Sequence, residues 1–264
     1  MRLMNANEVK DIQIQMYKYV ASFCEEHGIS YWIDSGSLIG TIRHRGFIPW
    51  DDDIDIGMLR PDFNRMIKEF NQSNMRYRFS SIEIDEDSFT AYGKVFDMNT
   101  ILFEPDENGY KSHVGIDIFV YDNAPDDDRK VKLMYCKRKM YQLMGGFQHR
   151  NFSDHGVWYK KYILKFMYGL TNIFPKNYFV KKIDKNAKSC ANQNTSRVGN
   201  FTASTIFTCN KRVFEHFVYK EFEGFQVRVP YGYDEWLTEY YGDYMRLPPI
   251  EKQVSHHKFL AYEV

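Results

Sequence analysis

Apolar side chains recur at helical spacing near the start of the chain. The positions that fall on one helical face are Val9, Ile12, Met16, Tyr19, Val20 and Phe23. Gly28 is a common stop for such a run, so the pattern predicts an amphipathic packing helix over residues 8–27. The next apolar run, residues 29–33, predicts a short buried strand.

A turn of small and polar residues follows that strand. Residues 34–37 read Asp-Ser-Gly-Ser, and the pattern predicts a second short helix from Leu38 to His44. A helix that begins after Gly and Ser offers free backbone N–H groups to a phosphate. Gly36 and Ser37 are therefore candidates for a phosphate-facing turn.

Acidic and apolar residues then alternate strictly. As a strand, Asp53-Ile54-Asp55-Ile56 turns both carboxylates to one face and both isoleucines to the core. Residues 115–120 predict another strand, in which Asp117 is flanked by isoleucines and a phenylalanine. A carboxylate so placed needs a partner, and a metal ion is one of the few groups that suffices.

The rest of the chain divides into a strand-rich part, a helical part and a mixed C-terminal part. A helix is expected from Pro61, a good first helical residue. Other expected helices cover 126–174, 177–190 and 231–241, and expected strands fall near 77–84, 90–96, 100–103 and within 197–229.

Composition places the chain among soluble globular proteins. Its 264 residues suffice for one sizeable core, and its 35 basic and 35 acidic residues balance, so we expect no nucleic-acid partner. The four cysteines lie far apart and form no CxxC pair, which excludes a zinc knuckle and a disulfide framework.

No apolar signal-peptide region or membrane-length apolar run is present, so we expect a cytoplasmic protein. The segment 158–174, WYKKYILKFMYGLTNIF, leaves two interpretations open. It lies on the inner face of the membrane, or it packs on the core with its lysine stems along apolar surface.

The carboxylates indicate metal-dependent phosphoryl transfer. For that chemistry, the strand with Asp117 must lie beside the strand with Asp53 and Asp55. Hard oxygen ligands suit Mg²⁺ or Mn²⁺, and two such ions about 3.5–4 Å apart can bridge a transferring phosphoryl group. An EF-hand loop is excluded, because Ile56 stands where that loop requires glycine.

The run GSLIGTIRHRGFIPWDDDIDIGM closely resembles the signature of LicD-type phosphocholine transferases, which are related to the fukutin-related ribitol-phosphate transferases. Similar blocks follow at KVFDMNT, GIDIFVYDNAP and EGFQVRVPYGYDEWLTEYYGDYMRLPP. The resemblance implies an α+β fold: a nucleotidyltransferase-like mixed sheet flanked by helices, with a mainly helical second lobe. Within one domain, it suggests a core over 1–125, a helical lobe over 126–195 and a C-terminal part over 196–264.

The resemblance also implies roles for particular residues. Asp53 and Asp55 match the metal-binding pair, and Asp117 matches the third carboxylate. Asp51 matches an aspartate that contacts the metal directly or through water. We therefore expect Asp53, Asp55 and Asp117 to be catalytic and all four aspartates to hold two ions.

Substrate binding is expected from a second set of residues. Those expected to contact the donor are Gly36, Ser37, Arg43, His44, Lys94 and Trp50. Arg43 and His44 would donate to phosphate or CMP, and Lys94 would reach the same phosphates. If the alcohol is choline, the aromatic candidates for its cation are Trp50, Tyr31, Tyr92 and Tyr121. The alternative for each of them is a place in the core, which is the commoner role of a single aromatic residue.

The activity implied is transfer of a phospho-alcohol from a CDP-linked donor, such as CDP-choline, to a sugar hydroxyl, with release of CMP. We expect the acceptor to be a lipid-linked saccharide of a lipopolysaccharide or teichoic-acid-type precursor, met at the inner membrane face. Two alternatives remain open. One is a nucleotidyltransferase that releases pyrophosphate, and the other is a non-catalytic glycan- or nucleotide-binding protein on the same scaffold.

Overall fold

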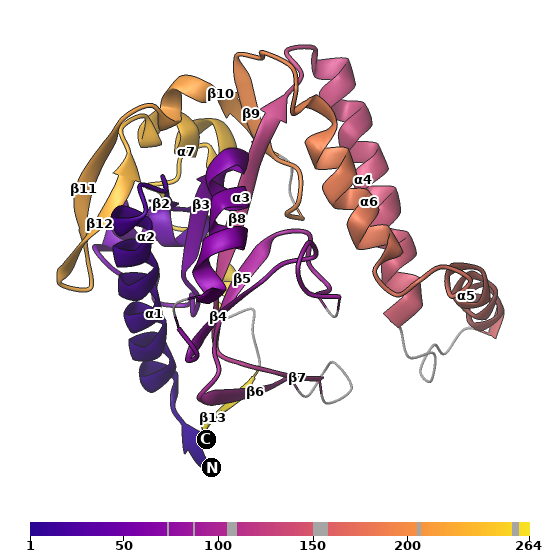
Figure 1. The fold of residues 1–264 in the computed structure, drawn as a ribbon, viewed down its shortest axis with the longest axis horizontal. Helices are drawn as coiled ribbons and strands as arrows, with labels where there is room; N and C mark the ends of the chain where they lie inside the picture. The colour runs from indigo at the N-terminus through magenta and orange to yellow at the C-terminus, as the bar shows by residue number, and fades with distance from the viewer. Residues whose placement is uncertain (73, 87, 105–109, 150–157, 205–206, 255–258) are drawn as a thin grey trace.

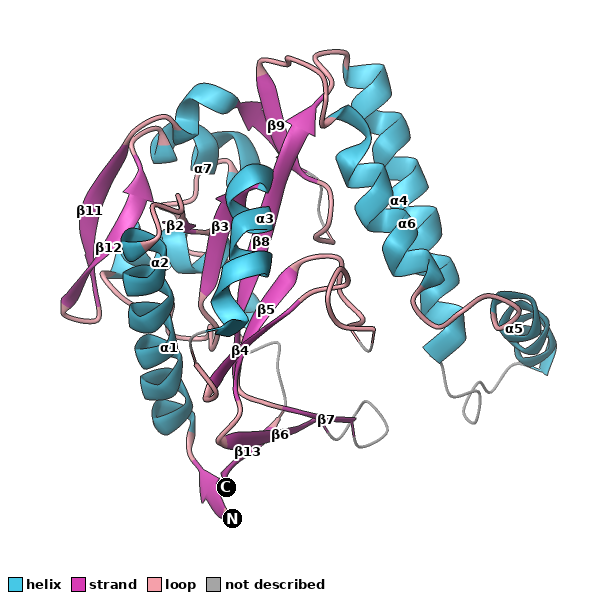
Figure 2. Cartoon of the chain, in the orientation of Figure 1, coloured by secondary structure: helices cyan, strands magenta, loops and turns pink. Residues whose placement is uncertain are grey.

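The structure is a computed structural model of residues 1–264 (Figure 1). It describes all residues except 73, 87, 105–109, 150–157, 205–206 and 255–258, and it leaves out the side chains of residues 104, 110, 149 and 158–161. After the alternating start from β1 to α3, a run of strands, a run of helices and a second run of strands follow one another along the described chain (Figure 2). Segregated runs of this kind, with mostly antiparallel pairing, confirm the expected α+β class.

A mixed sheet of seven strands forms the centre of the molecule. Its strands are β2 (Trp32–Ile33), β3 (Asp55–Leu59), β4 (Tyr77–Ser80), β5 (Gly93–Asp97), β8 (Gly115–Ala124), β9 (Arg197–Asn200) and β10 (Phe207–Asn210). The order is β10-β9-β8-β3-β2, with β5 also paired to β8 and β4 paired to β5. The β3–β8 pair is parallel and the other pairs are antiparallel.

Two smaller sheets flank the central one. The first contains β1 (Arg2–Met4), β13 (Leu260–Glu263), β6 (Thr100–Glu104) and β7 (Tyr110–Ser112), in that order. The second is the hairpin of β11 (Phe217–Phe222) and β12 (Phe225–Pro230). The chain ends therefore meet in one sheet, and N and C lie side by side in Figure 1.

Seven α-helices are described. They are α1 (Ala6–Glu26), α2 (Ser35–His44), α3 (Arg60–Glu69), α4 (Asp128–His149), α5 (Trp158–Thr171), α6 (Tyr178–Ala187) and α7 (Tyr233–Tyr241). Four short 3₁₀ segments cover Phe70–Gln72, Lys188–Cys190, Lys211–Phe214 and Ile250–Lys252. In the part of the chain that the structure describes, none of the helices combines the length and the apolar character that crossing a membrane requires.

Helix α1 confirms the expected amphipathic helix and begins two residues earlier than predicted. The Asn5 side chain accepts hydrogen bonds from the backbone N–H groups of Asn7 and Glu8, and Glu8 accepts one from the N–H of Asn5. This capping box satisfies donors that the first helical turn leaves unpaired. Its buried face then packs against the central sheet, where Gln13 donates to the carbonyl of Gly115.

Helix α2 begins at Ser35 rather than at the predicted Leu38, so Gly36 and Ser37 lie in its first turn. Asp34 takes the N-cap position, and Ser35 has φ 49°, in the left-handed region. A non-glycine residue rarely adopts that conformation unless the surrounding structure holds it there. Local turn residues do not reveal such a constraint, which explains the misplaced boundary.

Three strands begin or end at other residues than the sequence predicts. The run predicted at 77–84 pairs only to Ser80, because residues 81–85 form a turn in which the N–H groups of Ile84 and Asp85 donate to the Ser81 carbonyl. The run predicted at 90–96 pairs only from Gly93. β3 likewise begins at Asp55, so Asp53 precedes the strand, although Ile54 and Ile56 are both fully buried as expected.

The helical part forms a lobe beside the sheet. The segment predicted as helical over 126–174 contains two helices, α4 and α5. α4 packs along α6, and α5 contacts α4 at the end farthest from the sheet (Figure 1). A buried guanidinium joins lobe and core: Arg60 donates to both carboxylate oxygens of Asp122 on β8 at 2.8 Å, and its Nη1 lies 3.3 Å from Asp184 Oδ1 on α6.

Candidate active site

Three ionisable side chains form a row across the central sheet. In the strand register, Lys94 of β5 is the partner of Asp117 of β8, and Asp117 is the partner of Asp55 of β3. Register partners project to the same face of a sheet. The prediction that the strand with Asp117 lies beside the strand with Asp55 is therefore confirmed.

Lys94 supplies the partner that the Asp117 carboxylate needs. Its Nζ lies 2.8 Å from Asp117 Oδ1, and both side chains are partly buried. The sequence placed Lys94 among the phosphate-binding residues and expected a metal beside Asp117. In the structure the lysine makes an ion pair with that carboxylate, while a phosphate contact of Lys94 remains a prediction.

A second acidic group lies in the segment before β3. Carboxylate oxygens of Asp51, Asp52 and Asp53 all lie within 4.8 Å of one another. A Cβ added to Gly36 would lie 2.6 Å from Asp51 Oδ2. The carboxylate of Asp51 thus sits against the first turn of α2 in a space that only glycine leaves open. Asp52, which the sequence analysis did not single out, belongs to this group.

The carboxylates repel one another in a site of low solvent access. Burial, together with the charges of Asp51 and Asp117, raises the pKa of Asp53 to about 8. Burial and the charges of Asp53 and Asp117 also hold the pKa of Asp55 well above its usual range. Crowded carboxylates of this kind are a donor set that suits a hard divalent cation, which relieves their repulsion. Asp51, Asp52, Asp53 and Asp55 are the residues that could hold it, with Asp117 adjoining.

Ser37 has a structural contact of its own. Its buried hydroxyl accepts a hydrogen bond from the Asp55 N–H at 3.0 Å and donates to the Asp53 carbonyl at 3.3 Å. This bridge fixes the backbone that carries both carboxylates against α2. A phosphate contact of the Gly36-Ser37 turn remains a prediction, and backbone N–H groups would have to make it.

The structure adds Asp34 and Tyr241 to the site. Asp34 is fully buried, accepts hydrogen bonds from the Tyr121 hydroxyl at 2.9 and 3.1 Å, and donates its N–H to the Asp55 carbonyl. Burial raises the pKa of Asp34 to about 6. Tyr241 on α7 is 41% exposed, and partial burial together with the charges of Asp34 and Asp55 raises its pKa. Tyr241 lies in the C-terminal block that the sequence analysis quoted, but only the fold brings it near the carboxylates.

Two of the four aromatic candidates for a choline cation are core residues. Tyr31 is 1% exposed, and Tyr121 is 3% exposed and packs against both Trp32 and Phe214. Their ring faces are therefore covered by the protein, which confirms the core interpretation for both and removes them as candidates for the choline cation. Trp50 and Tyr92 are partly exposed and remain candidates.

Arg43 and His44 lie at the end of α2, near the C-terminal part of the chain. Arg43 Nη1 donates to the Tyr244 carbonyl at 2.7 Å, and its Nε lies 3.4 Å from His44 Nδ1. The His44 ring meets the Trp50 ring edge-on at a centroid distance of 6.3 Å. Arg43 thus ties α2 to the segment after α7, and donor contacts of Arg43, His44 and Trp50 remain predictions.

The chain is similar to known proteins, to one of them along nearly its whole length. Residues 28–143 match the family model described as LicD/FKTN/FKRP, nucleotidyltransferase domain. The chain is 34% identical over 271 residues to lipopolysaccharide cholinephosphotransferase LicD of Haemophilus influenzae, covering 99% of both proteins. It is 29% identical over 104 residues to ribitol 5-phosphate transferase FKRP of Mus musculus, covering 39% of this chain and 19% of that protein. The human FKRP is 44% identical over 45 residues, 17% of this chain and 9% of that protein.

Proposed function

Because this chain belongs to the LicD family, we propose that it transfers phosphocholine, or a related phospho-alcohol, from a CDP-linked donor to a saccharide hydroxyl and releases CMP. The observation that carries the proposal is the row Lys94–Asp117–Asp55 beside the acidic group of Asp51–Asp53. The relative that matches the chain along 99% of its length is named as a lipopolysaccharide cholinephosphotransferase. That name supports phosphocholine as the transferred group and a glycan as the acceptor.

Metal binding is part of the proposal. Asp51, Asp53 and Asp55, with Asp117 adjoining, would hold two divalent ions, Mg²⁺ or Mn²⁺. When bound, such ions neutralise the charge of the reacting phosphates. The first turn of α2, where Asp51 packs against Gly36, would present backbone N–H groups to the diphosphate of the donor.

Residues of the chain itself would accept the proton of the acceptor hydroxyl and hold the reacting groups in position. The acceptor hydroxyl would give its proton to the Asp117 carboxylate, whose position Lys94 fixes by their ion pair. The hydroxyl oxygen would then bond to the phosphorus distal to the nucleoside, and the bond from that phosphorus to the CMP oxygen would break. Positioning and charge neutralisation would supply most of the rate.

A lipid-linked acceptor would bring the protein to the inner membrane face. Several large apolar side chains of α5 and the segment after it are exposed: Tyr162, Ile163, Phe166, Tyr168, Leu170, Ile173 and Phe174. Exposed apolar patches of this kind mark interaction surfaces. We propose that α5 rests on the membrane surface, with the catalytic core on the cytoplasmic side.

Product analysis tests the function. Purified protein with Mg²⁺ is incubated with CDP-choline, CDP-ethanolamine, CDP-ribitol, CDP-glycerol or CTP and an oligosaccharide acceptor, and CMP is separated from pyrophosphate. We expect CMP and a phosphorylated glycan from at least one CDP-alcohol, and no pyrophosphate from CTP. Release of pyrophosphate would instead identify a nucleotidyltransferase, and the absence of any turnover would favour a binding protein.

Substitutions in the row Lys94–Asp117–Asp55 test whether this site carries the activity. Asp55→Asn and Asp117→Asn should abolish transfer, while Asp11→Asn, an exposed aspartate on α1, should leave it unchanged. Full activity of either site variant would rule out the assigned roles.

A further inference from the structure

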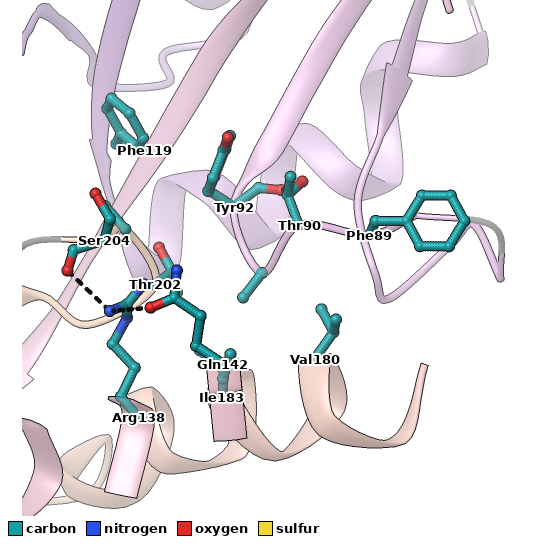
Figure 3. A pocket seen from close by; sticks show the side chains of 12 residues that line it. Phe89, Thr90, Tyr92, Phe119, Arg138, Gln142, Val180, Ile183, Thr202 and Ser204 are labelled. Atoms are coloured by element: carbon teal, nitrogen blue, oxygen red, sulfur yellow. Dashed lines mark hydrogen bonds between the residues drawn. The ribbon is translucent and has the colours of Figure 1, made fainter. Parts of the chain in front are cut away.

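A cavity of about 290 Å³ lies between the central sheet and the helical lobe (Figure 3). Its sheet side is formed by Tyr92, which directly precedes β5, and Phe119 of β8, whose rings lie 5.1 Å apart. Tyr92 is two residues from Lys94, and Phe119 is two residues from Asp117. Side chains two positions apart on a strand share a face, so the cavity adjoins the ion pair of the carboxylate row.

The opposite wall carries a buried cation. Arg138 of α4 is 3% exposed, and its Nη1 donates to the Ser204 carbonyl at 2.9 Å and to Gln142 Oε1 at 3.2 Å. Its Nε is buried and has no hydrogen-bond partner, and within the described residues no carboxylate lies within ion-pair distance of it. Burial lowers the pKa of Arg138, consistent with a guanidinium that lacks a counter-charge.

An arrangement of this kind is costly without a ligand. The buried Nε–H of Arg138 loses its hydration, and no protein acceptor replaces it. In Figure 3, Arg138 and Gln142 lie across the cavity from Phe119 and Tyr92. The cavity thus has the aromatic rings of Phe119 and Tyr92 on one side and the hydrogen-bond donors of Arg138 on the other.

We propose that this cavity receives the pyrimidine base of the donor nucleotide, with Arg138 donating to the O2 and N3 atoms of cytosine. The proposal rests on the proposed function, since it places one part of the CDP-linked donor. A planar base suits the slot beside Phe119, and its adjacent acceptors match the fork of an arginine. The exocyclic amine of cytosine is a donor, and the Gln142 and Thr202 side-chain oxygens are acceptors at the same wall.

The size and lining of the cavity favour a base over a phosphate. Its volume is at the lower end of ligand pockets, which suits a single ring. Apolar side chains such as Ala91, Val180 and Ile183 complete the lining. The phosphates of the same donor belong at the carboxylate row, two residues along the strands, so one nucleotide can reach both places.

Equilibrium titration with nucleoside monophosphates tests the proposal. Full-length protein with Mg²⁺ is titrated with CMP, UMP and ribose 5-phosphate. UMP presents a donor at N3, where CMP presents an acceptor. We expect CMP to bind at least about tenfold more tightly than UMP, as a bidentate pair typically provides. Arg138→Met should remove that preference and weaken CMP binding about tenfold or more, with ribose 5-phosphate unaffected.

Two controls separate binding from folding. Lys137→Met removes an exposed cation from the next position of α4 and should leave CMP binding unchanged. Arg138→Met should melt at or above the wild-type temperature, because it deletes a buried charge without a buried partner. If Arg138→Met does not fold, Phe119→Leu takes its place and should weaken CMP and UMP alike.

The outcomes distinguish this proposal from the proposed function. If Arg138→Met binds CMP as tightly as the wild type, or changes only the KM of the acceptor, the base pocket is ruled out. Neither result would contradict the proposed transferase activity. A wild-type protein that binds no nucleotide would also rule out the base pocket. Arg138-dependent CMP binding without any turnover of CDP-alcohols would support the pocket and count against the transferase.

Discussion

At the scale of single residues, the carboxylates are the part of the site that sequence could predict. The alternation of Asp53 and Asp55 with buried isoleucines fixes their common face, and Asp117 is conspicuous among apolar neighbours. Lys94 could not be matched to Asp117 in the same way, because their contact depends on the register of two strands. Asp34 and Arg138 likewise become informative only once burial and partners are known.

Gly36→Ala probes the contact between α2 and Asp51. The added methyl would lie 2.6 Å from Asp51 Oδ2, so the carboxylate must move. We expect transfer to fall by about tenfold or more, since a small misplacement of a catalytic group has that effect. Circular dichroism should be unchanged.

Gly146→Ala is the matched control for that variant. Gly146 lies in α4, and an added Cβ meets nothing within 4 Å. Replacing glycine by alanine inside a helix should stabilise the protein by about 0.5–1 kcal/mol and leave transfer unchanged. Equal activity of the two variants would contradict the role given to Gly36.

A divalent metal ion should stabilise the folded protein by binding the crowded carboxylates. Burial and mutual repulsion raise the pKa values of Asp53 and Asp55, so a bound cation relieves a cost of the folded state. We expect Mg²⁺ or Mn²⁺ to raise the melting temperature of the wild type, with a shift that grows with the logarithm of the metal concentration above its Kd. The double variant Asp53→Asn/Asp55→Asn should lose that response in a thermal melt. An equal response of wild type and variant would place the metal elsewhere.

At the scale of elements, the sequence predicted the type of each long segment better than its limits. α1 has both an apolar stripe and a capping box, and it agrees with the prediction to within two residues at each end. The start of α2 was misplaced because Ser35 holds a left-handed conformation that the fold imposes. The division of the helical part into α4 and α5, and the pairing of α4 with α6, follow from packing and not from periodicity.

The stability of the core next to the helical lobe should depend on the buried ion pair between Arg60 and Asp122. Asp122 on β8 accepts two hydrogen bonds from Arg60, and removing its charge leaves a buried guanidinium facing an amide. We expect Asp122→Asn to lower the free energy of unfolding by about 3 kcal/mol, toward the low end for a broken buried pair. Urea denaturation measures it. Asp128→Asn, which removes an exposed partner of Arg197, should change it by less than about 1 kcal/mol.

Helix α5 should govern membrane association. Ile163 is 57% exposed and Phe166 is 69% exposed on this helix. We expect Ile163→Ser/Phe166→Ser to reduce co-sedimentation with anionic liposomes several-fold, because apolar area drives interfacial binding. Leu133→Ser, an exposed leucine on α4, is the control. Unchanged sedimentation of the α5 variant would favour packing of α5 against another protein surface.

At the scale of the whole molecule, the resemblance implied the α+β architecture, and periodicity alone did not. Short strands such as β2 and β9 carry too few residues for a pattern to reveal their partners. The pairing of β3 with β8 is the exception, since the expected chemistry of three aspartates predicted that the two strands are neighbours, although it did not predict their parallel direction. Placement of α7 near the carboxylates, through Tyr241, had no signal in the local sequence.

The small sheet that holds both chain ends has a consequence for synthesis. β13 lies between β1 and β6, so both neighbours lack a partner along one edge until residues 260–263 are available. On the ribosome, β1 is made first and has no β13 to pair with until translation is nearly complete. The exposed edges of β1 and β6 are then open to other chains. We expect a polypeptide stalled before residue 260 to be a substrate for chaperones, even when its catalytic sheet has already formed.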